Sequence, residues 1–113
     1  GKAAQRTPPL RRMLESGVPV GAGTDATRVA SYNPFVSLYW MTTGKTLGGL
    51  RLYPKNALLS REEALRLYTQ GSTWMSREEA KRGAISPGQL ADLAVLTNDY
   101  FTIPEEEIKS LVS

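Results

Sequence analysis

The acidic residue with the most distinctive setting is Asp25, which follows a short apolar run at residues 18–20 and two glycines, Gly21 and Gly23. A run of this kind is typical of a buried strand, and α/β barrels place their catalytic groups at the carboxyl ends of such strands. Asp25 is therefore the candidate catalytic residue. A turn or cap residue is the simpler alternative, because Asp is common at such positions for its local hydrogen bonds.

Two residue types that commonly carry chemistry are missing, since the 113 residues contain no His and no Cys. Without His, the sequence lacks the commonest metal ligand and the usual base of a catalytic triad. Without Cys, it can form neither a disulfide nor a thiolate metal site. Metal-dependent or triad chemistry would therefore need more ligands than these residues supply.

The length and charge of the chain limit the classes of protein to which it can belong. Its 113 residues fit one domain, whereas a complete eight-fold barrel needs about 250 residues. The net charge is +3, and Lys and Arg are scattered among Glu, so we expect no nucleic-acid partner. The N-terminus has no apolar signal core, and no run approaches the ~20 apolar residues of a membrane span. We therefore expect a cytoplasmic protein without a membrane partner.

A short helix is expected before the apolar run. Thr7 followed by two prolines is a helix-start signal, apolar residues recur at helical spacing from Leu10 to Leu14, and Gly17 supplies a left-handed stop. Helix, tight connection and strand make half of a βαβ unit. A parallel neighbour for the strand at residues 18–20 is not evident in the sequence.

A second helix is expected from Asn33 and Pro34, which combine a capping side chain with Pro at the first helical position, to Gly44. Its body, residues 35–41, is apolar almost all round. Such a helix is buried on several sides or lies at an interface. We expect the chain to self-associate through this exposed apolar helix. Residues 45–56 have no periodicity and predict a long loop.

The clearest helix prediction begins at Ser60, because Ser60 and Glu63 have the spacing of a capping box. Apolar residues at i, i+3, i+4 and i+7 continue as far as Trp74 and Met75, which we predict to lie in the core or at an interface. A second capping box at residues 76–79 predicts another short helix, which Gly83 ends.

Strands are expected in the next part of the chain. Residues 84–85 and 91–96 flank a turn at Pro87 and Gly88, which predicts a β-hairpin or a strand entering a small sheet. Asp92, the second acidic candidate, lies far along the chain from residue 25, so we assign it a structural role, paired with a turn N–H. A brief acidic helical turn follows Pro104.

Two short motifs are similar to phosphate-binding loops. Residues 21–26 fit a loose G-x-G-x-x-A fingerprint, but no long helix opens at Gly23, and no acidic residue follows before Glu62 to hold a ribose hydroxyl. Residues 44–46 are similar to the tail of a P-loop, yet its first glycine would fall at Tyr39, inside a helix. Nucleotide binding is therefore only a third hypothesis.

Residues 23–25, the helix at 60–75 and above all residues 83–96, which read GAISPGQLADLAVL, resemble the C-terminal end of the amidohydrolase superfamily. The most similar branch is the amidohydrolase 3 group of metal-dependent hydrolases. In that family a helix leads into the eighth strand of a TIM barrel, which ends in an aspartate, and further helices run into a small β-sandwich. The resemblance covers nearly the whole chain.

The resemblance implies an α/β fold, as a C-terminal fragment of a metal-dependent hydrolase. Residues 1–82 would form the end of the TIM-barrel catalytic domain, with the last helix, strand eight and the helices that follow. Residues 83–113 would form part of the composite β-sandwich domain.

The resemblance also implies a role for Asp25, which matches the aspartate that binds the metal and shuttles a proton. The metal expected in the full-length protein is a divalent ion, zinc first. Such an ion lowers the pKa of its bound water to about 7, and a nearby carboxylate takes the proton from this water and passes it to the leaving group. The family's other ligands, His residues and a Lys or Glu on earlier strands, have no match here. A catalytic zinc takes three protein ligands, so we expect this chain alone to bind no metal and to be inactive.

The interval between Asp25 and Glu62 contains cations but no acid. They are Arg28, Lys45, Arg51, Lys55 and Arg61. A solvated loop surface is the preferred explanation. The functional alternative is that one or more of these cations bind an anionic part of the substrate, and Arg28 is the first candidate. A guanidinium can donate two parallel hydrogen bonds to a carboxylate.

The leading hypothesis is therefore the C-terminal part of a metal-dependent amidohydrolase that hydrolyses an amide or cyclic amide C–N bond of a small molecule. The alternative is a stand-alone, non-catalytic binding or interaction domain in which Asp25 is structural. The coding sequence upstream of Gly1 separates the two.

Overall fold

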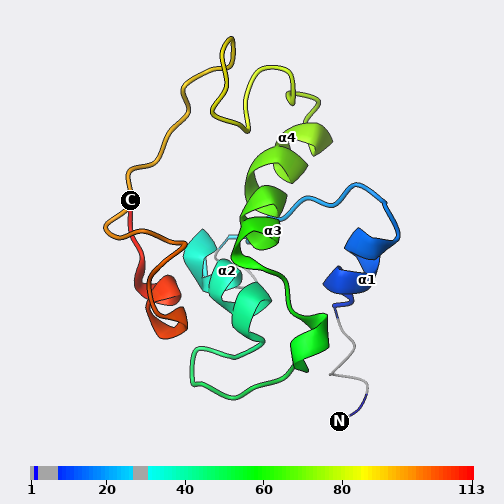
Figure 1. Ribbon diagram of the computed structural model, residues 1–113, viewed down its shortest axis with the longest axis vertical. Helices are drawn as coiled ribbons and strands as arrows, with labels where there is room; N and C mark the ends of the chain where they lie inside the picture. The colour runs from blue at the N-terminus through cyan, green and yellow to red at the C-terminus, as the bar shows by residue number, and fades with distance from the viewer. Residues whose placement is uncertain (1, 3–7, 27–30) are drawn as a thin grey trace.

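The computed structural model describes residue 2, residues 8–26 and residues 31–113 (Figure 1). Its regular structure is helical. The α-helices are α1 (Leu10–Glu15), α2 (Pro34–Thr43), α3 (Arg61–Arg66) and α4 (Ser72–Met75). A π-helical turn, η3 (Leu67–Gly71), joins α3 to α4, and two 3₁₀ helices are η2 (Lys55–Ala57) and η4 (Glu105–Ser110).

The predicted strands do not form in the described ranges, where β-pairing is limited to one isolated antiparallel bridge between Lys45 and Arg51. Residues 18–20 belong to no sheet, and residues 84–85 and 91–96 do not pair as a hairpin. The turn between them does form, with the N–H of Gln89 donating to the carbonyl of Ser86 at 3.2 Å. A strand is stable only when a neighbour satisfies its backbone groups. These segments have no such neighbour among the described residues, so the predictions of strands at residues 18–20, 84–85 and 91–96 are wrong. The assignment of the chain to the end of a barrel and to part of a sandwich stays a prediction.

The first two helices confirm their predictions. Helix α1 is followed by Gly17 at φ +76°, while the predicted cap Thr7 lies outside the described residues. Helix α2 begins after Asn33, whose side chain accepts a hydrogen bond from the N–H of Phe35 at 2.9 Å, and it ends at Gly44 in the left-handed region. Both ends of α2 follow from local capping chemistry.

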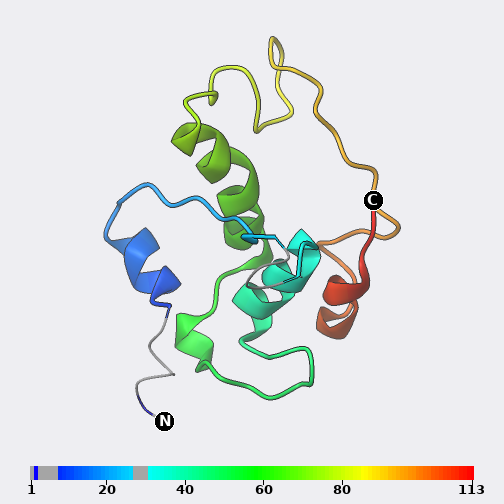
Figure 2. The ribbon, with the colours of Figure 1, turned by 180° about the vertical axis from the view of Figure 1, so that it is seen from behind.

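Helix α2 packs against η4, which the C-terminal part of the chain brings alongside it in both views (Figures 1 and 2). The buried core joins these two helices to α3 and η3. Its members are Leu38, Tyr39, Met41, Leu59, Ala64, Leu67, Tyr100, Ile103, Ile108 and Leu111. Helix α2 is therefore buried on several sides, as its sequence predicts. The same chain covers these core residues of α2, and self-association through this helix stays a prediction.

The C-terminal segment is also tied to the start of α3. The Arg61 guanidinium donates to the backbone carbonyl of Tyr100 at 2.8 Å, and the Tyr100 hydroxyl donates to the carbonyl of Arg61 at 2.9 Å. Burial raises the pKa of Tyr100 to about 12. The segment 99–111 thus packs on helices from the first 82 residues, and the division into two domains at residue 83 stays a prediction.

The helix from Arg61 to Met75 is continuous but not regular. The capping box forms as predicted, with Ser60 Oγ accepting from the N–H of Glu63 at 3.1 Å and Glu63 Oε2 accepting from the N–H of Ser60 at 2.7 Å. The π turn then adds one residue to a turn, which rotates everything after it by about 100° around the helix axis. Trp74 and Met75 are 49% and 55% exposed. Their predicted place in the core is wrong, and an interface stays open.

The second predicted capping box is also wrong. Ser76 is the C-cap of α4, and its hydroxyl donates to the carbonyl of Thr73 and to the carboxylate of Glu78 at 3.1 and 3.0 Å. Arg77 has φ +60°, which breaks the helical path at that point. Residues 78–83 form turns instead of a helix.

Within the described residues, no helix has the length and apolar character that crossing a membrane requires.

A bidentate ion pair ties α1 to the start of α3. Arg11 Nη1 and Nη2 donate to the two carboxylate oxygens of Glu63 at 2.7 and 2.8 Å, and Arg11 Nη2 also donates to the carbonyl of Leu58 at 2.6 Å. The hydrogen bonds from Arg11 and from the Ser60 N–H lower the pKa of Glu63 to about 2. One carboxylate therefore both caps α3 and anchors α1.

This pair predicts an acid-sensitive contribution to stability. Because the folded pKa of Glu63 lies below its ordinary value of 4.5, the contribution is present above pH 4.5 and is lost as the pH falls towards 2. The side chains are 28% and 36% exposed, so we expect about 1 kcal/mol after solvent screening. Urea unfolding at pH 6 and pH 3 should show that Glu63→Gln lowers the free energy of unfolding at pH 6. The difference between the free energies of unfolding at pH 6 and pH 3 should be smaller in this variant than in the parent protein. Glu62→Gln, which breaks only the exposed pair with Arg66, is the control and should change stability by a few tenths of a kcal/mol. Equal effects of the two variants would contradict the prediction.

Candidate functional site

Asp25 lies in the loop between α1 and α2 and is exposed. Its backbone has φ +53°, a left-handed conformation that Asp and Asn adopt more readily than other residues with a side chain. The sequence pattern predicts that Asp25 follows the end of a strand, and this prediction is wrong because residues 18–20 form no strand. It sits at a turn of the backbone that presents the carboxylate to solvent.

The segment leading to Asp25 is held by the helix at η3 and α4 instead of by a sheet. The N–H of Ala22 donates to the carbonyl of Leu67 at 2.9 Å. The hydroxyl of Ser72 lies 2.9 Å from the carbonyl oxygen of Ala22 and 3.0 Å from that of Leu67. Figures 1 and 2 show this loop crossing the helix. Both backbone polar groups of Ala22 are thereby satisfied.

A pocket of about 370 Å³ begins at Gly23 and Thr24, immediately before Asp25. Its other walls come from α2 and the loop that follows. They are Val36, Ser37, Tyr39, Trp40, Lys45, Thr46 and Leu47. The size falls in the range of small-molecule sites, and aromatic walls with a few hydroxyl groups are typical of them. Tyr39 and Trp40 thus belong both to the packing of α2 and to this pocket.

The cation in that pocket is already paired. Lys45 Nζ lies 2.6 Å from Glu106 Oε1, and the Tyr39 hydroxyl donates to Glu106 Oε2 at 3.0 Å. The Lys45 hydrogen bond, with help from Tyr39, lowers the pKa of Glu106 to about 2, and the same hydrogen bond raises the pKa of Lys45. Glu106 therefore compensates the charge of Lys45, and it also pairs with Lys109 at 3.3 Å.

Two of the other candidate cations also bind groups of this chain. The Arg51 guanidinium donates to the carbonyl of Thr43 at 2.8 Å, and that of Arg61 donates to the carbonyl of Tyr100. Lys55 lies in η2 and is exposed. Arg28, the substrate-binding candidate, lies outside the described residues and stays a prediction.

The described residues do not complete a metal site. Among them, no group of three or more His, Cys, Asp or Glu side chains could hold an ion, whereas a catalytic zinc takes three protein ligands. Asp25 offers one carboxylate. A metal would therefore need ligands in addition to those that this part of the chain places together.

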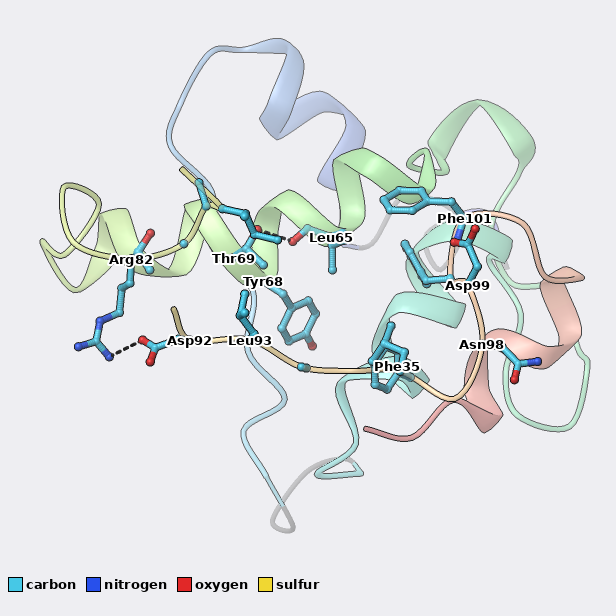
Figure 3. A pocket seen from close by; sticks show the side chains of 17 residues that line it. Phe35, Leu65, Tyr68, Thr69, Arg82, Asp92, Leu93, Asn98, Asp99 and Phe101 are labelled. Carbon is cyan, nitrogen blue, oxygen red and sulfur yellow. Dashed lines mark hydrogen bonds and ion pairs between the residues drawn. The ribbon is translucent and has the colours of Figure 1, made fainter. Parts of the chain in front are cut away.

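A second, larger pocket of about 740 Å³ lies between the helix and the extended segment after Gly83 (Figure 3). Tyr68 and Thr69 line the helix side, and Arg82 and Asp92 form an ion pair of 3.2 Å at one end. None of its lining residues comes from residues 18–26. The partner of Asp92 is thus a guanidinium and not the turn N–H that we expected, and its structural role stays a prediction.

Sequence reasoning missed the part that Ser72 and Gly71 play in holding the loop of Asp25. One signal was present, because a glycine inside a helical pattern costs about 1 kcal/mol relative to Ala and often marks a close backbone approach. The pattern gave no sign that residues so distant in sequence meet at that glycine.

Comparison with known proteins defines the class. The model of the amidohydrolase family matches residues 2–113, and the chain therefore belongs to that family. Membership indicates a TIM-barrel-type fold for the family domain. The chain is similar to the N-substituted formamide deformylase of Arthrobacter pascens, with 31% identity over 103 residues, which are 91% of this chain and 19% of that protein. It thus spans about a fifth of the length of this curated relative. No solved structure matches it.

Proposed function

We propose that this chain is the C-terminal part of a metal-dependent amidohydrolase that hydrolyses an amide or cyclic amide C–N bond. The carrying observation is that Asp25 follows a segment anchored at Ala22, and that the two residues directly before it, Gly23 and Thr24, line the 370 Å³ pocket. Family membership and a relative named as a deformylase support the same chemistry. The substrate is a small molecule with an N-substituted amide.

The proposed role of Asp25 is to hold and move a proton. Its carboxylate takes the proton of the attacking water and delivers it to the leaving nitrogen, a step that general acid–base catalysis accelerates by about 10²- to 10⁴-fold. In the full-length protein the same carboxylate would be one ligand of a divalent metal, for which zinc is our choice. The described residues of this chain do not complete that site, and we expect the chain alone to be inactive.

Residues 1–82 are assigned to the end of the barrel domain and residues 83–113 to the composite β-sandwich. We place the protein in the cytoplasm without a nucleic-acid or membrane partner. The alternative is a stand-alone binding or interaction domain in which Asp25 is structural.

One experiment with two stages separates these possibilities. The coding sequence upstream of Gly1 should contain several hundred codons, including a His-x-His motif, whereas a start codon directly upstream would contradict the proposal. The full-length protein should then release formate from an N-substituted formamide or hydrolyse another N-substituted amide, lose this activity with a chelator and regain it with Zn²⁺. Residues 1–113 alone, as the matched control, should release nothing. Full activity that survives the chelator would overturn the metal-dependent assignment.

A further inference from the structure

The loop that carries Asp25 meets the helix at its one irregular turn, η3. The hydroxyl of Ser72 lies between two carbonyl oxygens, that of Ala22 at 2.9 Å and that of Leu67 at 3.0 Å. A hydroxyl has one proton, which it shares here between the two acceptors. Leu67 also accepts the N–H of Ala22 at 2.9 Å. Three hydrogen bonds therefore converge where the loop crosses the helix, and two of them join the loop directly to it.

The backbones approach each other so closely that position 71 requires glycine and position 21 leaves little room for a side chain. A Cβ on Gly71 would collide with the carbonyl oxygen of Val20, and a Cβ on Gly21 would lie 3.0 Å from the carbonyl oxygen of Gly71. The φ angle of Gly71 is −63°, an ordinary helical value. The need for glycine at this position is therefore a matter of space and not of backbone conformation.

The π turn sets the direction of the Ser72 side chain. Because it adds one residue to a turn, it rotates the following residues by about 100° relative to a regular α-helix. The side chain of Ser72 would otherwise be directed away from Ala22. The same rotation leaves Trp74 half exposed. A π turn is less favourable than regular helix and is frequent at functional sites.

We propose that Ser72, presented by the π turn Leu67–Gly71, is a positioning residue for Asp25. This inference rests on the proposed function, because it assigns Ser72 a role through the catalytic carboxylate. Asp25 is three residues beyond Ala22, so the anchor lies within about 10 Å of its Cα along the chain. The double hydrogen bond fixes the register of residues 20–22 on the helix. That register sets where the left-handed turn at Asp25 presents its carboxylate.

The test uses the full-length enzyme and three substitutions at the contact. Ser72→Ala removes the hydroxyl, Ser72→Thr restores it, and Gly71→Ala pushes the loop away. Misplacement of a catalytic group by about 1 Å costs up to about 10²-fold. We expect Ser72→Ala and Gly71→Ala to lower kcat by about 10- to 100-fold with KM changed less than about twofold, and Ser72→Thr to recover most of kcat.

The control is Ser76→Ala, which makes the same change one turn further along. Its hydroxyl binds only Thr73 and Glu78 and has no contact with the loop, so kcat should stay within about twofold of the parent value. A Ser72→Ala enzyme with unchanged kcat, or one that Ser72→Thr does not rescue, would overturn the positioning role.

A second measurement separates this inference from the proposed function. Deuterium exchange of peptides covering residues 18–25 should become about tenfold faster in Ser72→Ala and stay unchanged in Ser76→Ala. Faster exchange together with no hydrolytic activity in any variant, including the parent, means that the proposed function has failed while the anchor is real. Unchanged exchange in Ser72→Ala means that the anchor itself is wrong, whatever the activity.

Discussion

Asp25→Asn should lower kcat of the full-length hydrolase by about 10²- to 10⁴-fold, the contribution expected of a positioned general acid–base group. Asn keeps the size of the side chain and one acceptor oxygen but cannot take a proton. It also tolerates φ +53° at this position, because Asn and Asp are the side chains best suited to the left-handed region. The substitution therefore removes the chemistry without straining the turn.

The matched control for this substitution is Asp92→Asn. Asp92 pairs with Arg82 at 3.2 Å and lines the 740 Å³ pocket, which shares no residue with the loop of Asp25. We expect its kcat to stay within about twofold of the parent value. Steady-state kinetics on both variants, with circular dichroism to verify folding, checks the prediction. An Asp25→Asn enzyme that retains full kcat would leave Asp25 as a structural turn residue.

Ile108→Ala should destabilise the protein by about 2–5 kcal/mol, the usual range for truncating a fully buried Ile. Ile108 is 0% exposed and lies in η4, which packs against α2 beside Leu38 and Tyr39. The smaller side chain loses its transfer free energy and leaves a cavity that the surrounding side chains fill only in part. Since domains are stable by about 5–15 kcal/mol, this is a large fraction of the total.

Urea unfolding of Ile108→Ala and Val112→Ala measures the effect against a nearby aliphatic residue. Val112 is 54% exposed, and Thr97 binds its backbone groups, which Ala preserves. We expect this control to change stability by less than about 0.5 kcal/mol. A loss below about 1 kcal/mol for Ile108→Ala would mean that η4 does not form part of the core with α2.

The sequence predicted the helix ends well because each depends on atoms a few residues apart. Ser60 and Glu63 bind each other's backbone N–H groups, and Asn33 caps α2 through the N–H of Phe35. Gly17 and Gly44 stop their helices in the left-handed region. In each case the residue type and its spacing contain the whole interaction. The motif at residues 83–96 also led to the right family, which the family model confirms.

The strands and the second capping box show where local patterns are insufficient. The apolar run at 18–20 has the composition of a strand, but a strand needs a partner, and composition does not say whether one is present. At Ser76 the hydroxyl donates to Glu78 and Thr73 instead of accepting from the N–H of residue 79. The Ser76 hydroxyl can therefore act as a donor at a helix end or as an acceptor at a helix start, and the spacing of the residues does not distinguish the two roles.

By itself, the sequence determined helices α1 and α2 and the start of α3, the caps at Asn33 and Ser60, the family and the identity of Asp25 as the candidate carboxylate. The tertiary structure alone decided how that carboxylate is held. Ser72 and Ala22 are 50 residues apart, and Gly71 meets Val20 only because both backbones fold to the same place. One extra residue in the turn at Leu67–Gly71 changes which side chains face the loop. Periodicity assumes a constant 100° per residue, so it predicted Trp74 in the core or at an interface and did not indicate Ser72.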